Sequence, residues 1–152
     1  MTKQDYKCTV YYNRKIGEGF YKIGLALTAK GAESFSKTLP GQFAEIDLSE
    51  ASLPDINEIP EKFKDSARRK IILRRPFSFS DIRINSEQTI VEILYCLVGP
   101  ASLRMSNLKK GQKISVIGPL GNGFSVFKDK RTALLVLGGM GAGPLVHLAK
   151  HL

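Results

Sequence analysis

The sequence predicts a mainly β protein, followed by the beginning of an α/β unit. Up to about residue 130, short stretches rich in aromatic and β-branched residues are separated by Gly, Pro and Asn turn signals. Strands at this spacing are typical of a closed antiparallel barrel or a sandwich. After residue 131 the alternation stops, and a continuous apolar run leads into a glycine cluster and an amphipathic stretch.

Six strands are expected in the first part of the chain. The third follows a Pro-Gly turn at Pro40 and Gly41, and the last follows the turn formed by residues 109–112. The six expected strands are residues 6–13, 20–27, 42–48, 70–80, 89–99 and 113–121.

Two segments interrupt this pattern. Residues 52–70 are polar and contain two prolines, so we expect a loop insertion with one or two helical turns that begin at Pro60. Residues 102–108 are expected to form a short helix with Ser102 as its cap.

The domain boundary is expected between residues 130 and 131. Residues 133–137 ("ALLVL") are continuously apolar, as in a parallel strand that is buried on both faces. Glycines follow, and then a helix is expected to begin at Pro144. The sequence thus predicts a β domain over 1–130, with 52–70 as its insertion, and the first strand, loop and helix of an α/β domain over 131–152.

Composition narrows the setting. The chain has 152 residues and a formal net charge of +9, from 23 Lys and Arg against 14 Asp and Glu. A basic surface attracts phosphates of any kind, although a protein that is merely rich in lysine is equally compatible. The sequence contains neither a membrane-spanning apolar run nor a signal peptide. Cys8 and Cys96 both lie in expected strands, which favours free thiols and a cytoplasmic location.

Two stretches carry the strongest binding chemistry. In "RRPFSF", Pro76 indicates a sheet edge, while Arg75 offers a charged fork to phosphates and Phe77 and Ser78 offer a ring surface and a hydroxyl. An ordinary strand with a surface arginine is the alternative. In "LYCLVGPAS", residues 94–102, a strand delivers Gly99 and Ala101 to the start of a helix, where open amides favour phosphate.

Two glycine-rich stretches are weaker signals. "GPLGNGF", residues 118–124, allows close backbone approach but is also typical of a hairpin turn. Gly138, Gly139, Gly141 and Gly143 do not meet the G-x-G-x-x-G pattern of dinucleotide-binding folds. Their position between an expected strand and an expected helix still favours phosphate contact.

Together, "PGQF", "RRPFS", "GPLGNGF" and "LGGMGAGPLVHLAK" resemble the ferredoxin–NADP⁺ reductase superfamily. Within it the likeness is to the electron-transfer subunits of dihydroorotate dehydrogenase B, over nearly the whole chain apart from residues 52–70. The resemblance implies a six-stranded Greek-key flavin-binding barrel followed by a nicotinamide-binding domain.

The resemblance also implies roles for single residues. Arg75 would pair with FAD phosphate, Phe77 and Ser78 beside Pro76 would line the flavin ring, and Ala101 and Ser102 beside Gly99 would meet the pyrophosphate. A second flavin-contacting strand and the loop for the nicotinamide dinucleotide are implied at Leu94, Tyr95, Cys96, Gly139, Gly141 and Pro144. Relatives often carry Arg where this chain has Cys96, which puts one phosphate contact in doubt.

The implied function is an FAD-dependent oxidoreductase subunit that relays electrons between an iron–sulfur centre and NAD(H), with a catalytic dihydroorotate dehydrogenase-type subunit as partner in pyrimidine biosynthesis. Relatives carry a cysteine cluster for [2Fe–2S], which requires four thiolates, whereas this chain has two cysteines. The sequence therefore resembles the first part of a longer reductase, with a natural minimal flavin barrel as the alternative. No acid–base catalytic side chain and no metal ligand is expected, and His147 and His151 lack a third ligand.

Two other functions remain open. One is a sulfhydrogenase-type or other NAD(P)H reductase subunit of the same superfamily. The other is a basic β-barrel that binds single-stranded nucleic acid through aromatic and cationic residues. The aromatic residues available for this are Tyr11, Tyr12, Phe20 and Tyr21, with "YYNRK" as the only dense cluster.

Overall fold

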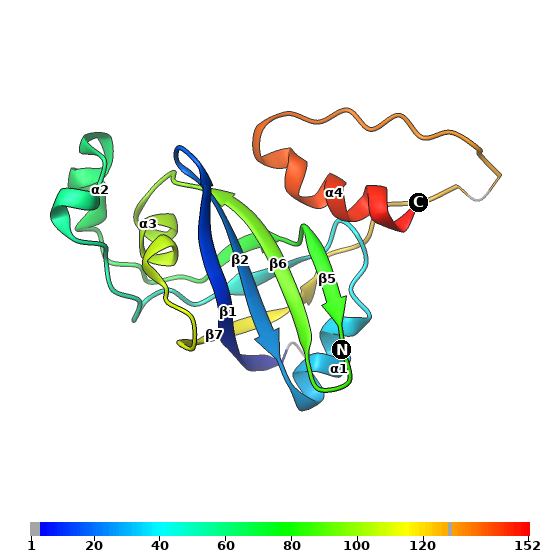
Figure 1. Cartoon of the computed structure of the whole chain (residues 1–152), viewed down its shortest axis with the longest axis horizontal. Coiled ribbons are helices and arrows are strands. Elements are labelled where there is room, and N and C mark those ends of the chain that lie inside the picture. Colours follow the sequence, from blue (N-terminus) through cyan, green and yellow to red (C-terminus); the bar gives the residue numbers. More distant parts are fainter. Residues whose placement is uncertain (1–3, 128) are drawn as a thin grey trace.

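One antiparallel sheet, curled around an apolar core, forms most of the molecule (Figure 1). The structure is a computed structural model, and it describes residues 4–127 and 129–152. The strands are β1 (Asp5–Gly17), β2 (Phe20–Leu27), β3 (Phe43–Ile46), β4 (Arg75–Ser78), β5 (Asp81–Ile84), β6 (Thr89–Cys96) and β7 (Lys113–Leu120).

Helices lie at the ends and edges of the sheet (Figure 1). The α-helices are α1 (Ala29–Ser36), α2 (Lys64–Ala67), α3 (Pro100–Asn107) and α4 (Ala142–His151), and short 3₁₀ turns are η1 (Ile56–Glu58), η2 (Glu61–Phe63) and η3 (Gly139–Gly141). No helix in the described ranges is both long and apolar enough to cross a membrane.

The strand order is β4-β3-β7-β1-β2-β6-β5, and all neighbours are antiparallel. The long strand β1 lies near the middle and pairs with β2 on one side and β7 on the other. Strands β2 and β6 stay in register along their whole length, from Phe20 opposite Cys96 to Leu27 opposite Thr89. This unbroken register fixes the position of the β6 residues that line the site described below.

The sheet curls until its two edges meet at residues 79 and 80. Strands β4 and β5 occupy opposite edges of the sheet, yet they follow each other in the chain. The amide of Phe79 donates to the carbonyl of Gln42 at 3.4 Å, and the next amide, of Ser80, donates to the carbonyl of Glu92 at 2.8 Å. Consecutive residues therefore bond to opposite sides of the sheet, which becomes a half-barrel.

Aromatic side chains fill the core between the half-barrel and α1. Phe35 of α1 is fully buried and meets the ring of Phe79 edge-on, with centroids 5.9 Å apart. Tyr6 of β1 meets Phe35 in the same way at 5.8 Å. Burial of each such ring contributes about 1.5–3 kcal/mol, so α1 closes one end of the half-barrel.

The Pro-Gly turn takes the form expected from the sequence. The amide of Gln42 donates to the carbonyl of Leu39, and Gly41 adopts a positive φ of 96°, which a glycine accepts without strain. The side chain of Gln42 then donates to the carbonyl of Gly121 at 2.9 Å. The two glycine-containing turns are thereby held together.

The mainly β, antiparallel fold class is confirmed, but the expected strand count and closure are wrong. The sheet has seven strands, because Asp81–Ile84 forms the additional strand β5, and the ladder of the described residues runs from edge to edge without closing. The expected strand over 70–80 is regular only from Arg75 to Ser78. The sequence reasoning also missed α1, whose single large apolar residue, Phe35, gives little helical periodicity.

The expected buried parallel strand at 133–137 is also wrong. This stretch is irregular in the structure, and Leu134 and Val136 are 88% and 80% exposed. A strand needs a neighbour for its backbone groups, and the described residues offer no parallel strand beside it. The expected boundary at 130/131 falls in the irregular segment between β7 and η3 and stays a prediction.

The insertion at 52–70 packs as a small unit of its own. The turns η2 and α2 follow Pro60, as expected, whereas the 3₁₀ turn η1 lies before it and was not expected. The insertion forms a second apolar cluster with α3. Ile59 and Ala67 from the insertion and Leu103 from α3 are all buried in this cluster. The insertion therefore supports the outer side of α3.

Candidate functional site

A cavity of about 500 Å³ lies between the edge strand β4, strand β6, the start of α3 and the turn before α4. Its residues come from three separate segments of the sequence (75–78, 94–102 and 140–144), which the curl of the sheet brings together. The cavity is lined by Arg75, Pro76, Phe77, Ser78, Leu94, Tyr95, Cys96, Val98, Gly99, Pro100, Ala101, Ser102, Met140 and Pro144.

Strand β4 supplies the cation. Pro76 lies on an edge strand, where its missing N–H costs no ladder bond on the open side, as expected from the sequence. The neighbouring Arg74 is held by Asp5 at 2.7 Å and by the hydroxyl of Ser115 at 2.8 Å. Arg75 makes no salt bridge with any described carboxylate, so its guanidinium remains available to a ligand.

Strand β6 supplies an aromatic wall. Tyr95 is 3% exposed, and its ring stacks on Tyr21 of β2 with centroids 5.4 Å apart. Phe77 meets Tyr95 edge-on at 6.3 Å. The hydroxyl of Tyr95 donates to the side-chain oxygen of Asn13 at 2.9 Å. Burial raises the pKa of Tyr95 although this hydrogen bond opposes the rise, so the phenol stays neutral at physiological pH.

The start of α3 faces the cavity with its backbone. Gly99 is the N-cap and Pro100 is the first helical residue, so the expected cap at Ser102 is wrong by three positions. The Ser102 hydroxyl accepts from the amides of Val98 and Gly99 at 2.9 and 3.2 Å and donates to the carbonyl of Gly99. Because this hydroxyl is engaged inside the turn, a ligand would meet the first-turn amides of Ala101 and Ser102.

The glycine loop and α4 close the far side. Met140 and Pro144 line the cavity, and Gly143 brings α4 against β6, where a Cβ would lie 3.8 Å from that of Leu94. The helix begins at Ala142, not at Pro144 as expected. Lys150 near its end forms an ion pair with Asp81 of β5.

All candidate residues from the sequence except two line this cavity. Gly139 instead lines a smaller adjacent cavity of about 270 Å³, which shares Leu94, Tyr95 and Met140 with the main one. Gly141 lines neither cavity. The position of the other candidate residues along the cavity does not by itself show that they bind a cofactor. This role remains a proposal.

Sequence reasoning missed Met140 and Asn13. Met140 stands between the glycines of the loop, and that position was a signal that it would follow the loop to the cavity. Asn13 lies mid-strand in β1 among aromatic residues, and its role depends on bonds to residues more than 80 positions away. No local pattern identifies such a residue.

The cysteines do not form a metal site. Cys8 is buried in the core, and burial raises the pKa of its thiol to about 12. Cys96 lines the cavity, and both thiols are free. Within 4–127 and 129–152, no three His, Cys, Asp or Glu side chains are grouped to hold a metal ion. Two cysteines do not fit an iron–sulfur cluster with four thiolate ligands, so no electron-transfer step is assigned through one here.

Comparison with known proteins gives a consistent relationship, although no protein-family model matches the chain. The dihydroorotate dehydrogenase B (NAD⁺) electron-transfer subunit of Fusobacterium nucleatum is 37% identical over 146 residues, which is 95% of this chain and 48% of that protein. The same subunit of Bacillus velezensis is 35% identical over the same shares. The chain spans about half the length of the curated relatives it matches.

Solved structures agree on the fold. The cytochrome P450 reductase GcoB of Amycolatopsis superposes with a TM-score of 0.64 at 22% identity, covering 97% of this chain and 38% of that one. A ferredoxin reductase of carbazole 1,9a-dioxygenase gives 0.66 at 18% identity, covering 99% and 40%. The chain thus shares the fold of these reductases, and its sequence is similar to the electron-transfer subunits of dihydroorotate dehydrogenase B over about half of their length.

Proposed function

We propose that the cavity binds FAD and that the chain is the flavin-holding part of an electron-transfer subunit. One observation carries this proposal: an available guanidinium, an aromatic wall and an open helix start converge on one cavity. A dinucleotide with a planar ring and a pyrophosphate needs these three chemistries together.

The residues present fit such a ligand. The cavity, at about 500 Å³, lies within the range of about 300–1,000 Å³ that is usual for cofactor sites. Arg75 is exposed at one side, whereas Phe77 and Tyr95 form the apolar side. A helix N-terminus carries about half a positive charge, which adds to that of Arg75 for a diphosphate.

Each group then has a separate task. Arg75 forms charge-assisted hydrogen bonds to phosphate oxygens, and the amides of Ala101 and Ser102 donate to the same diphosphate. Phe77 and Tyr95 exclude water from the ring, and Ser78 supplies a hydroxyl to a ring heteroatom. A bound flavin accepts electron pairs and passes electrons singly, which is the chemistry a relay requires.

The wider activity follows the relatives. We infer that the intact protein passes electrons between NAD(H) and a catalytic dihydroorotate dehydrogenase-type subunit, because the relatives are named for that enzyme. Another reductase of the same fold is the alternative, since the solved structures with this fold include a cytochrome P450 reductase and the ferredoxin reductase of a dioxygenase. Two free thiols suit a reducing compartment such as the cytoplasm.

Titration with FAD tests the proposal. The purified chain is expected to bind FAD and to show flavin absorption bands near about 370 and 450 nm that stay with the protein through gel filtration. Riboflavin, which lacks the phosphates, is the matched ligand control and should bind far more weakly. The absence of FAD binding at concentrations up to about 100 μM would refute the assignment, because the binding free energy of such a site would be weaker than about 5.5 kcal/mol.

A further inference from the structure

Asn13 lies outside the cavity wall and connects two of its sides. Its side-chain nitrogen donates to the carbonyls of Met105 and Leu108 at 2.8 and 3.1 Å, with the carbonyl of Ser106 at 3.4 Å. Its side-chain oxygen accepts from the hydroxyl of Tyr95 at 2.9 Å. One short side chain thus joins the end of α3 to the aromatic wall on β6.

The chemistry of these partners requires an amide at position 13. Carbonyl oxygens only accept, so the NH₂ group must face the end of α3, and this leaves the amide oxygen for the Tyr95 hydroxyl. Asn13 adds a donor to the carbonyl of Met105, which also accepts from the amide of Leu108 at 3.1 Å, and it donates to the carbonyl of Leu108 just past the helix. Aspartate would turn a second oxygen toward these carbonyls, and leucine would remove both of these side-chain hydrogen bonds.

This connection fixes the two sides of the cavity relative to each other. The end of helix α3 is bonded to Asn13, and its start lies at the cavity, where Gly99, Ala101 and Ser102 line the wall. Because a helix of two turns moves as a rigid rod, holding its end also holds its first amides. Tyr95, held by the same side chain, packs against Phe77 of β4. Asn13 itself does not line the cavity.

We propose that Asn13 is a positioning residue for the flavin site: it sets the start of α3 against the Tyr95–Phe77 wall without touching the ligand. The inference rests on the proposed function, since it assumes that the cavity holds FAD. It adds a residue on β1 that supports two walls at once.

A double-mutant cycle on FAD affinity tests this. Asn13→Leu is expected to weaken FAD binding about tenfold, because one buried hydrogen-bonding group is lost. Tyr95→Phe is expected to weaken it by less. The double variant should bind about as Asn13→Leu does, because the interaction between the two side chains is already lost. At saturating FAD, Asn13→Leu should also change the visible circular dichroism of the bound flavin, since its ring would meet a displaced wall.

Asn85→Ala is the matched control. The side chain of Asn85 also bonds to the backbone, since its oxygen accepts from the amides of Glu87 and Gln88. These bonds lie in the β5–β6 turn. The Asn85→Ala variant should be less stable toward urea, but its FAD affinity and the dichroism of its bound flavin should equal those of the wild type. Wild-type affinity and dichroism in Asn13→Leu, or equal losses in Asn85→Ala, would overturn the positioning role alone. A wild-type chain that does not bind FAD would reject the proposed function and this inference with it.

Discussion

Arg74, immediately before β4, and Arg75, the first residue of β4, have opposite surroundings. Arg74 is held in a network with Asp5 and Ser115, and Asp47 lies 3.8 Å away, whereas Arg75 on the next position faces the cavity. Side chains alternate along a strand, so a shift of one residue would exchange their environments. The first guanidinium ties β4 to the sheet, and the second is available for chemistry.

Arg75→Ala is therefore expected to weaken FAD binding by about tenfold to a hundredfold, because a charge-assisted contact to phosphate is lost. Arg75→Lys should recover only part of the affinity, since the ammonium cannot form the paired contact. Isothermal titration calorimetry measures both. Arg68→Ala, at an exposed position in the insertion, is the control and should bind as wild type does. An unchanged affinity in Arg75→Ala would place the phosphates elsewhere.

Cys96 provides a second check of the site. Iodoacetamide at pH 8 should modify Cys96, which lines the cavity, and leave Cys8, which is buried with a pKa of about 12. Bound FAD should slow this reaction by at least about tenfold, as expected when most sites are filled. Mass spectrometry of tryptic peptides distinguishes the two cysteines. Equal labelling with and without saturating FAD would contradict a shared location.

At the scale of the elements, helix α4 is attached to the sheet by one face. It lies over β5 and β6 (Figure 1), where Gly143, His147 and Leu148 form its buried face. The ion pair of Lys150 with Asp81 adds a second anchor. Residues 133–137, which precede this helix, are largely exposed. The helix is therefore attached through its own buried face and not through these residues.

Acidification should loosen α4. Burial lowers the pKa of His147 below its usual 6.5, although Asp81 on β5 opposes this, and His151 and Lys150 on α4 reinforce it. The neutral imidazole fits the docked helix, so the docked state loses stability as pH falls below about 6.5 toward the lowered pKa. Urea midpoints at pH 7.5 and 5.5 measure this. Wild type should lose more stability on acidification than His147→Gln, and an equal loss in both would exclude His147 as the cause.

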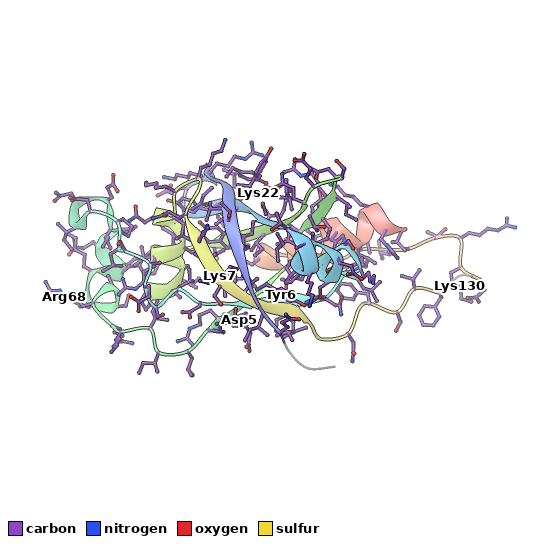
Figure 2. All side chains as sticks on the ribbon, turned by 90° about the horizontal axis from the view of Figure 1, so that it is seen from below. Asp5, Tyr6, Lys7, Lys22, Arg68 and Lys130 are labelled. Atoms are coloured by element: carbon purple, nitrogen blue, oxygen red, sulfur yellow. The ribbon has the colours of Figure 1, made fainter. Side chains whose placement is uncertain are left out.

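At the scale of the whole molecule, one curled sheet carries both the core and the cavity. Cationic side chains occur along the full length, from Arg68 at one end to Lys130 at the other, with Lys7 and Lys22 between them (Figure 2). The net charge of +9 is therefore distributed, and phosphate selectivity must come from local geometry at the cavity.

Ligand binding should stabilise the sheet, because the cavity wall contains the edge strand β4 together with β6, which lies next to the opposite edge. At an FAD concentration of about 100 times the dissociation constant, the linkage gain is about 2.7 kcal/mol. For a chain of this size this raises the melting temperature by about 5–10 °C. Differential scanning calorimetry of the full chain with FAD and with riboflavin measures the difference. An unchanged melting temperature with FAD would show that the ligand does not bind the native state.

The sequence reveals what depends on neighbours in the chain. Local turn chemistry and the alternation of side chains were enough to predict strand β2, the Pro-Gly turn and the edge position of Pro76. The grouping of "RRPFS" with "LYCLVGPAS" was predictable only through resemblance to a known superfamily. Nothing local shows that residues 75 and 95 approach each other.

The failures have physical reasons too. Strand β5 is only four residues long, and it lies between the strands expected over 70–80 and 89–99, where the sequence shows no separate strand signal. The apolar residues 133–137 have the composition of a strand, but a strand forms only where a neighbour accepts its hydrogen bonds. Asn13 was missed because its four partners come from α3 and β6, far away in sequence.

The place of β7 between β3 and β1 has a consequence for biosynthesis. Strand β3, which carries β4 and Arg75, joins the rest of the ladder through β7, and among the strands of the described sheet β7 is synthesised last. The guanidinium and the start of α3 therefore cannot be held at their final separation until residues 113–120 have emerged. Such long-range pairing forms late and slowly. Binding of FAD should accordingly begin only after β7 has been synthesised.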